Sequence, residues 1–168
     1  MRMDPSVKSI LRAIRTEIEV TRARKLSAQG KIRDAREKLR EVYKSVGQPP
    51  PSSDVEPYLN ILYGSISSQM GNDRDAFLAC EMAVEQIRSD EMRRKYRPED
   101  LKYLLYCCRA ILAKATNYSD SLAFSLAKSI DVKYDDLEID KVSMKIRNTF
   151  DIPPELGREY DEYIAENT

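Results

Sequence analysis

The sequence predicts an all-α protein of about seven or eight helices, and three observations support this fold class. Apolar residues recur at helical spacing through most of the chain, and no segment alternates apolar and polar residues long enough for a strand. Only five glycines and eight prolines occur, so long stretches contain no helix breaker. The length of 168 residues, with 42% hydrophobic, suits a single helical domain over residues 1–168.

Two helices are expected in the first 46 residues. Asp4 is a helix N-cap, and Pro5 takes the first helical position, where a missing N–H costs nothing. Gly30 ends the first helix, because glycine readily adopts the left-handed conformation found there. The apolar positions of the first helix are Val7, Ile10, Leu11, Ile14, Ile18 and Val20. Those of the second are Ile32, Ala35, Leu39, Val42 and Tyr43.

The middle of the chain predicts a loop and two more helices. Residues 47–54 contain three consecutive prolines, which favour a stiff extended connector, and a proline-rich ligand for a recognition domain is the alternative. The third helix is expected from about residue 55 to 70 and the fourth from about 74 to 89, with a turn at Gly71. Residues 90–97 either extend the fourth helix or form a loop.

The last part of the chain predicts four further helices. Pro98 opens a fifth helix that is apolar nearly all round between residues 101 and 112, so we expect it to be the most buried. The turn Asn117-Tyr118-Ser119 leads into a sixth helix that reaches Ile130. A seventh helix groups Ile139, Met144, Ile146 and Phe150. A short last helix follows Pro153 and Pro154 and carries Leu156, Tyr160 and Ile164.

Small residues in the central part have a telling spacing. Gly64, Gly71, Ala76 and Ala83 are separated by seven, five and seven residues. Such residues would let two helices of a hairpin approach closely. This pattern resembles a tetratricopeptide repeat over residues 57–90. The large positions depart from the family, which prefers Trp, Leu, Tyr, Phe and Pro where this chain has Asn60, Tyr63, Ser67, Cys80 and Ser89.

Weaker copies of the pattern lie in residues 16–49 and 103–132. Ala23, Gly30 and Ala35 repeat the seven and five spacing, and Asn117 takes the turn position of the third copy. The resemblance implies stacked antiparallel helix hairpins in a right-handed superhelix over residues 1–132, with residues 133–168 as acidic C-terminal capping helices. The alternative is an irregular helical bundle in which the spacing is a coincidence.

The resemblance also implies a binding surface. In that family the first helices of the hairpins line the concave side and hold a peptide or partner protein, which predicts a non-catalytic adaptor. The corresponding partner-binding residues are Glu17, Val20, Arg24, Ser27, Tyr58, Ile61, Ser65, Ser68, Gln69, Leu104, Ile111 and Lys114. The alternative for each is a core residue that is buried against the acidic terminal segment.

The chemistry of an enzyme is missing from the sequence. The chain has no histidine, which removes the commonest general base and zinc ligand. Cys80, Cys107 and Cys108 lie in apolar runs without metal-ligand spacing, and the acidic cluster at residues 135–140 lacks the glycine of a calcium loop. We therefore expect no catalytic residue, no cofactor and no metal. The odd number of cysteines and the absence of an apolar leader or membrane span indicate a cytoplasmic protein.

The zero net charge hides an asymmetry between the two ends. Residues 1–50 carry thirteen Lys and Arg against six Asp and Glu, whereas residues 135–168 carry four against ten. The two ends either attract one another or are simply solvated. A basic N-terminal hairpin that binds nucleic acid is the alternative function. A homo-oligomer is compatible with the sequence, and no membrane partner is expected.

Overall fold

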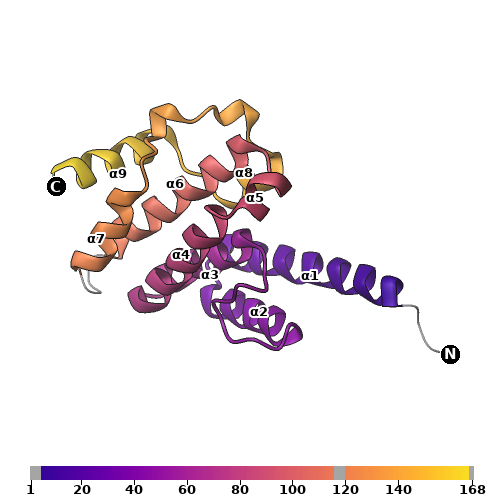
Figure 1. The fold of residues 1–168 in the computed structure, drawn as a ribbon. Helices are drawn as coiled ribbons and strands as arrows, with labels where there is room; N and C mark the ends of the chain where they lie inside the picture. Colours follow the sequence, from indigo (N-terminus) through magenta and orange to yellow (C-terminus); the bar gives the residue numbers. More distant parts are fainter. Residues whose placement is uncertain (1–4, 116–119, 167–168) are drawn as a thin grey trace.

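The computed structural model describes residues 5–115 and 120–166, and over these residues it is helical with no strand (Figure 1). This confirms the all-α fold class. The expected N-cap at Asp4 and the turn at Asn117-Tyr118-Ser119 lie outside the described residues. The elements are α1 (Pro5–Ala28), α2 (Ile32–Ser45), α3 (Pro57–Gln69), α4 (Asp73–Ile87), α5 (Asp90–Lys95), α6 (Pro98–Lys114), α7 (Asp120–Ser129), η1 (Tyr134–Asp136), η2 (Ile139–Lys141), α8 (Met144–Thr149) and α9 (Pro154–Glu166).

Consecutive helices pack along one another in pairs. The pairs are α1 with α2, α3 with α4, and α6 with α7, and α3 and α4 also contact α6. Gly30 connects α1 to α2 and Gly71 connects α3 to α4, and each glycine has a φ of +77°. Residues with a Cβ rarely adopt this conformation, so glycine is required at both turns. The predicted turns at these two glycines are therefore confirmed.

The closest approach in the central pair occurs at Gly64 of α3. A Cβ at this position would lie 3.2 Å from the Cβ of Ala79 and 3.5 Å from the carbonyl oxygen of Ala76. Ala76 and Ala83 are both completely buried. The predicted role of these small residues, to let α3 and α4 approach closely, is confirmed by this geometry.

We expect Ala76→Leu to lower the free energy of unfolding by about 1–3 kcal/mol, because the larger side chain overpacks the contact between α3 and α4. For a chain of this size the melting temperature should fall by roughly 3–10 °C. Thermal denaturation followed by circular dichroism measures the change. Ala165→Leu on the exposed side of α9 is the matched control. An Ala76→Leu variant that melts with its parent would contradict the close packing.

The charged segment after α4 forms a separate helix, which answers the question left open by its sequence. Ser89 has an extended backbone, with φ of −75° and ψ of 153°, so it ends the run of α4. Its hydroxyl oxygen accepts a hydrogen bond from the Met92 N–H, and the serine thereby caps α5. Met92 is buried, which holds this short helix against the core.

The predicted seventh helix is wrong as a single element. Ile139 belongs to η2, whereas Met144 and Ile146 belong to α8, and the chain is extended at Val142 and Ser143 between them. The break follows from a tertiary contact, since the backbone N–H of Ser143 donates to the Asp100 carboxylate at 2.8 Å. Local periodicity cannot reveal a hydrogen bond to a residue 43 positions away.

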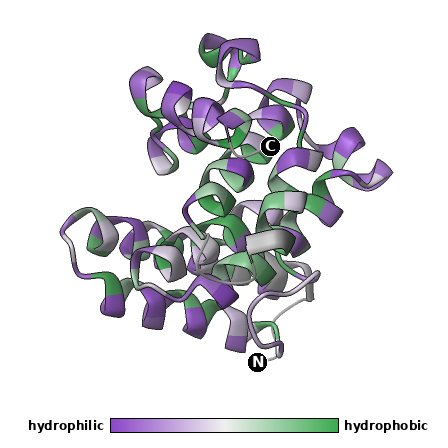
Figure 2. Cartoon of the chain, turned by 90° about the vertical axis from the view of Figure 1, so that its left-hand side faces the viewer, coloured by the Kyte–Doolittle hydropathy of each residue, from purple (hydrophilic) through white to green (hydrophobic). Residues whose placement is uncertain are grey.

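The part of the chain from residue 134 to residue 166, here called the C-terminal segment, turns back across the helix pairs (Figure 1). Its helix α9 packs on α6 and α7, and its η2 packs on α6. Helix α6 is buried along most of its length, as predicted. Apolar residues gather where the helices meet and hydrophilic residues lie along their outer sides (Figure 2). No helix among the described residues is long and apolar enough to cross a lipid bilayer.

Candidate functional site

A pocket of about 660 Å³ lies where α1, α2, α3 and α8 come together. Its walls are mostly apolar, and the chain brings them from positions more than a hundred residues apart. The apolar lining residues are Val20, Val42, Val46, Val55, Tyr58, Leu59 and Ile146. The charged lining residues are Glu17, Asp54, Glu56, Asp100 and Lys145, so four carboxylates and one ammonium group surround the apolar floor.

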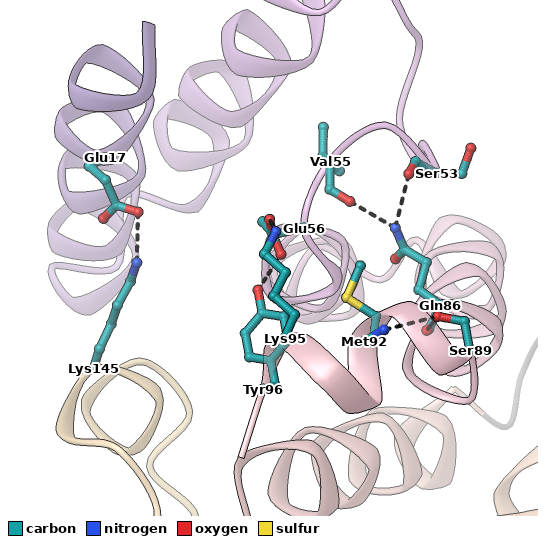
Figure 3. Close-up of polar contacts among 10 residues, drawn as sticks. All are labelled: Glu17, Ser53, Val55, Glu56, Gln86, Ser89, Met92, Lys95, Tyr96 and Lys145. Atoms are coloured by element: carbon teal, nitrogen blue, oxygen red, sulfur yellow. Dashed lines mark hydrogen bonds and ion pairs between the residues drawn. The ribbon is translucent and has the colours of Figure 1, made fainter. Parts of the chain in front are cut away.

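Lys145 is the one cation of this lining, and α8 directs it at two groups from other helices. Its Nζ lies 2.7 Å from Oε1 of Glu17 on α1, as Figure 3 shows. The same atom lies 5.1 Å from the centre of the Tyr58 ring on α3, which is within cation–π range. The next residue, Ile146, is buried. The chain therefore places its own Lys-Ile pair at the pocket.

The acidic rim is held by hydrogen bonds from neighbouring elements. Glu56 accepts from the Lys95 ammonium group and from the Tyr96 hydroxyl, which fixes the end of α5 against the start of α3 (Figure 3). Burial, together with the hydrogen bond to Glu56, raises the pKa of Tyr96 well above its usual value. Asp100 forms an ion pair with Arg97 at 3.5 Å.

Aromatic contacts fix α8 against α3. The rings of Tyr58 and Phe150 meet edge to face with their centres 5.4 Å apart. The Tyr58 hydroxyl is hydrogen-bonded to the Thr149 hydroxyl. Tyr103 of α6 donates to the carbonyl oxygen of Phe150, which directly follows α8. The end of α8 is therefore held by both α3 and α6. These contacts position Lys145 over the pocket.

The twelve predicted partner-binding residues divide into several groups. Glu17, Val20 and Tyr58 meet at the pocket, although Val20 and Tyr58 are largely buried. Arg24 and Ser27, on the last turns of α1, and Ser68, near the end of α3, are half-buried and line none of these hollows. Lys145 and Ile146 were not among the predicted residues, because the acidic composition of residues 133–168 indicated only helices that cap the end of the helix stack.

Four predicted residues lie under the C-terminal segment. Ser65, Gln69, Ile111 and Lys114 line a hollow of about 230 Å³. Its opposite wall comes from the C-terminal segment, through Phe150, Asp151, Ile152, Leu156 and Tyr160. The Lys114 ammonium group lies 5.2 Å from the centre of the Tyr160 ring. The chain's own C-terminal segment therefore faces this part of the predicted binding surface.

Two predicted partner contacts are wrong. Ile61 and Leu104 are both 0% exposed and belong to the hydrophobic core. The reason is that α3 and α6 are enclosed on two sides, by their pair partners and by neighbouring helices and the C-terminal segment. A helix enclosed in this way exposes little of its surface. The positions that would line the inner side of a superhelix, Ile61 and Leu104, are therefore part of the hydrophobic core.

The C-terminal segment is fastened to α6 by a buried cluster. Gly157 lies so close to Tyr134 that a Cβ would meet the ring at 2.3 Å. The Tyr106 hydroxyl donates to the Gly157 carbonyl oxygen at 2.7 Å, and its ring meets the Tyr134 ring edge to face. Arg109 adds an ion pair, with its Nε 3.4 Å from Asp161. Only glycine fits at position 157.

Burial raises the pKa of four tyrosine hydroxyls well above the usual value near 10, namely those of Tyr43, Tyr96, Tyr103 and Tyr106. Burial also raises the pKa of Tyr134. These groups ionise more readily in the unfolded chain. Their contribution to stability is therefore complete below about pH 10 and is lost as the pH rises above it. With no histidine in the chain, no such loss is expected near neutral pH.

The corresponding measurement is an alkaline titration. We expect the absorbance of tyrosinate and the loss of helical circular dichroism to rise together above about pH 10. A titration in which most tyrosines ionise near pH 10 while the helical signal stays intact would contradict the burial of these hydroxyls. Comparison with the chain in denaturant gives the normal titration of exposed tyrosine.

The arrangement defines an all-helical protein with a pocket of apolar floor and acidic rim. Among the residues that the structure describes, no three Cys, Asp or Glu side chains lie close enough together to hold a metal ion. The chain matches no protein-family model, and no characterised protein or solved structure is significantly similar to it.

Proposed function

We propose that the chain is a non-catalytic interaction module that holds a segment of a partner protein at the pocket between α1, α3 and α8. The observation that carries this proposal is the contact that the pocket lining already makes with one cation, that of Lys145. The ammonium group meets a carboxylate and a tyrosine ring, and the neighbouring Ile146 is buried in the apolar floor. A partner segment with a Lys or Arg beside an aliphatic residue would offer the same chemistry.

The electrostatics of the pocket favour this kind of partner. Four carboxylates and the Lys145 ammonium group line it, and Glu56 and Asp100 are already paired with Lys95 and Arg97, so the exchangeable carboxylate is that of Glu17. A partner cation is attracted to this carboxylate, whereas a phosphate is repelled by it. The Glu17–Lys145 pair is displaceable, because both side chains are about half exposed and such surface pairs contribute only about 0–1 kcal/mol. A partner cation can thus replace Lys145 at little cost.

The stacked, tetratricopeptide-like arrangement is part of the same proposal. Its support is the sequence of packed helix pairs, in which α2 contacts α3 and α4 contacts α6. In such a stack α1 and α3 would be first helices, and the pocket would lie on their shared face. A reducing compartment such as the cytoplasm suits the unpaired, buried thiols of Cys80, Cys107 and Cys108.

Selection from a random peptide library displayed on phage, with the purified full chain as target, tests the proposal. We expect the enriched peptides to share a Lys or Arg next to an aliphatic residue. Glu17→Lys should weaken binding of such a peptide at least tenfold, about 1.4 kcal/mol, because it reverses the charge at the rim. Glu37→Lys makes the same charge change on the exposed side of α2 and should leave affinity unchanged.

A second pair of variants tests the role of Lys145. Lys145→Ala should strengthen peptide binding, because the competing cation is removed, while stability changes by less than about 1 kcal/mol. Lys141→Ala removes another exposed lysine that is paired with an acid in the same segment and should have no effect on affinity. Peptides without a basic residue, or affinities that ignore both Glu17 and Lys145, would refute the proposed site.

A further inference from the structure

Helix α1 has a second apolar face that the rest of the described chain leaves about half exposed. Its N-terminal half extends away from the other helices (Figure 1). The face consists of Val7, Leu11, Ile14 and Ile18, which are 42%, 47%, 51% and 47% exposed. Their spacing of four, three and four residues keeps them in one line along the helix. We call these four residues the α1 stripe.

The α1 stripe lies opposite the face that α1 uses for its own fold. Val20 and Ala23 of the same helix are buried in the core next to α2. Single exposed apolar residues are normal on a protein surface, whereas a continuous line of them marks an interaction site. The stripe runs for eleven residues, or roughly 17 Å, which is about three helical turns. This length suits a helix–helix contact.

A basic edge accompanies the α1 stripe. Lys8, Arg15 and Arg22 follow it at intervals of seven residues, which places them along the same side of the stripe. Lys8 and Arg15 form no ion pair with any residue of the described part of the chain. Among the residues that the structure describes, Arg22 pairs only with Glu19 of its own helix, at 2.9 Å. The opposite edge carries Glu17, which Lys145 already engages.

We propose that the α1 stripe docks an amphipathic helix of a partner protein, with an apolar seam and with acidic side chains along the edge that meets Lys8, Arg15 and Arg22. The seam buries the four aliphatic side chains. Acidic residues at seven-residue intervals in the partner pair with the basic edge and fix its register. This surface is separate from the pocket, and it requires a partner of the opposite charge.

The charge pattern argues against a second copy of this chain as the occupant. In an antiparallel pair of two α1 helices, each basic edge would face the same basic edge of the other copy. In a parallel pair the basic edge would face the opposite edge of the other copy, where Glu17 offers one carboxylate to three basic side chains. Neither arrangement supplies a carboxylate to each of Lys8, Arg15 and Arg22.

A lipid surface would also attract the basic edge, but the apolar face suits it less well. Interfacial helices usually present a broad apolar face with aromatic residues. The α1 stripe is a single line of aliphatic side chains, which is the form of a helix–helix seam. The stripe therefore favours a helix as its occupant.

Binding of two designed three-heptad peptides to the full chain tests this inference. Both have the same Leu and Ile seam, and one carries Glu along its edges whereas the other carries Lys. Fluorescence anisotropy should show that the Glu peptide binds at least tenfold more tightly, and that high salt weakens its binding. Ile14→Glu in the full chain should abolish binding. Leu122→Glu makes a comparable change at an exposed apolar residue of α7 and should not.

Several outcomes would overturn the inference. Equal binding of the two peptides, or binding of neither, contradicts the acidic partner. A concentration-dependent dimer in analytical ultracentrifugation that Ile14→Glu dissociates makes a second copy the occupant. Tighter binding to vesicles of phosphatidylcholine and phosphatidylserine than to the Glu peptide makes it a membrane. The displayed basic peptides report on the pocket, and the Glu peptide with Ile14→Glu reports on the α1 stripe, so failure at one surface is distinguishable from failure at the other.

Discussion

Asn60→Leu is expected to lower the free energy of unfolding by about 4 kcal/mol, because the asparagine connects three elements inside the core. It is 0% exposed, and its Oδ1 accepts from the Tyr43 hydroxyl at 2.6 Å. Its Nδ2 donates to the carbonyl oxygen of Ser52 and to Oε1 of Gln86, both at 2.8 Å. Leucine has a similar volume but leaves these partners unpaired, at about 1–3 kcal/mol for each buried group.

Thermal and denaturant unfolding measure this loss, which corresponds to a fall of roughly 8–16 °C in melting temperature. Asn148→Leu, at an exposed position of α8, is the matched control and should change stability by less than about 0.5 kcal/mol. Adding Tyr43→Phe to Asn60→Leu should restore part of the loss, because the hydroxyl that lost its acceptor is gone. Near-parental stability of Asn60→Leu would show that the network contributes little.

Arg109→Met should cost about 3–5 kcal/mol, because Arg109 is a buried cation that joins α6, α7 and α9. It is 7% exposed, and its guanidinium group donates to the Ile130 carbonyl oxygen at 2.8 Å. It also pairs with Asp161 at 3.4 Å. Methionine fills the space of the side chain but removes the cation beside Asp161, which keeps its hydrogen bond from the Tyr134 N–H, and removes the donor to the Ile130 carbonyl oxygen.

Two further variants separate the charge from the packing. Arg88 donates to the Ser129 carbonyl oxygen at 2.9 Å near the same end of α7, but it does so on the surface. Arg88→Met should therefore cost less than about 1 kcal/mol. Combining Arg109→Met with Asp161→Asn removes the unpaired charge and should recover part of the stability. If Arg88→Met and Arg109→Met unfold alike, burial of the Arg109 cluster is not what stabilises α9.

Much of the secondary structure could be predicted because its signals are local. Proline at the start of α6, and glycine with positive φ after α1 and α3, act through the backbone of one or two residues. The small residues Gly64 and Ala76 also indicated the correct helix pair, because they mark the two helix surfaces that approach each other closely. These features need no knowledge of the rest of the chain.

The path of the C-terminal segment could not be predicted, because the contacts that set it are distant in sequence. Lys145 contacts Glu17 across 128 positions, and the Tyr106 hydroxyl contacts Gly157 across 51. The expected attraction between a basic start and an acidic end also missed this pair, in which the start supplies the acid and the end supplies the base. Net charge over a segment says nothing about which single side chains meet.

The same limit explains the divided outcome at the candidate site. The register taken from the tetratricopeptide resemblance placed Glu17, Val20 and Tyr58 on one binding face, and the structure brings these three together at the pocket. It could not show that Ile61 and Leu104, at equivalent spacing, are enclosed by other helices. Nor could it identify Lys145, whose role depends on where a short helix packs.

The late position of the C-terminal segment gives the folding of this chain a definite order in time. Helices α1 to α4 leave the ribosome first, and their pairing depends on contacts between neighbours in sequence. Thr149 and Phe150, which contact Tyr58 and Tyr103, are made after these four helices. At about 5–20 residues per second, the stretch from Tyr103 to Phe150 takes roughly 2–10 seconds to synthesise. During that interval Tyr58 and Tyr103 of the nascent chain lack their contacts with Thr149 and Phe150. A factor at the ribosome exit could bind this exposed surface before the C-terminal segment packs on it.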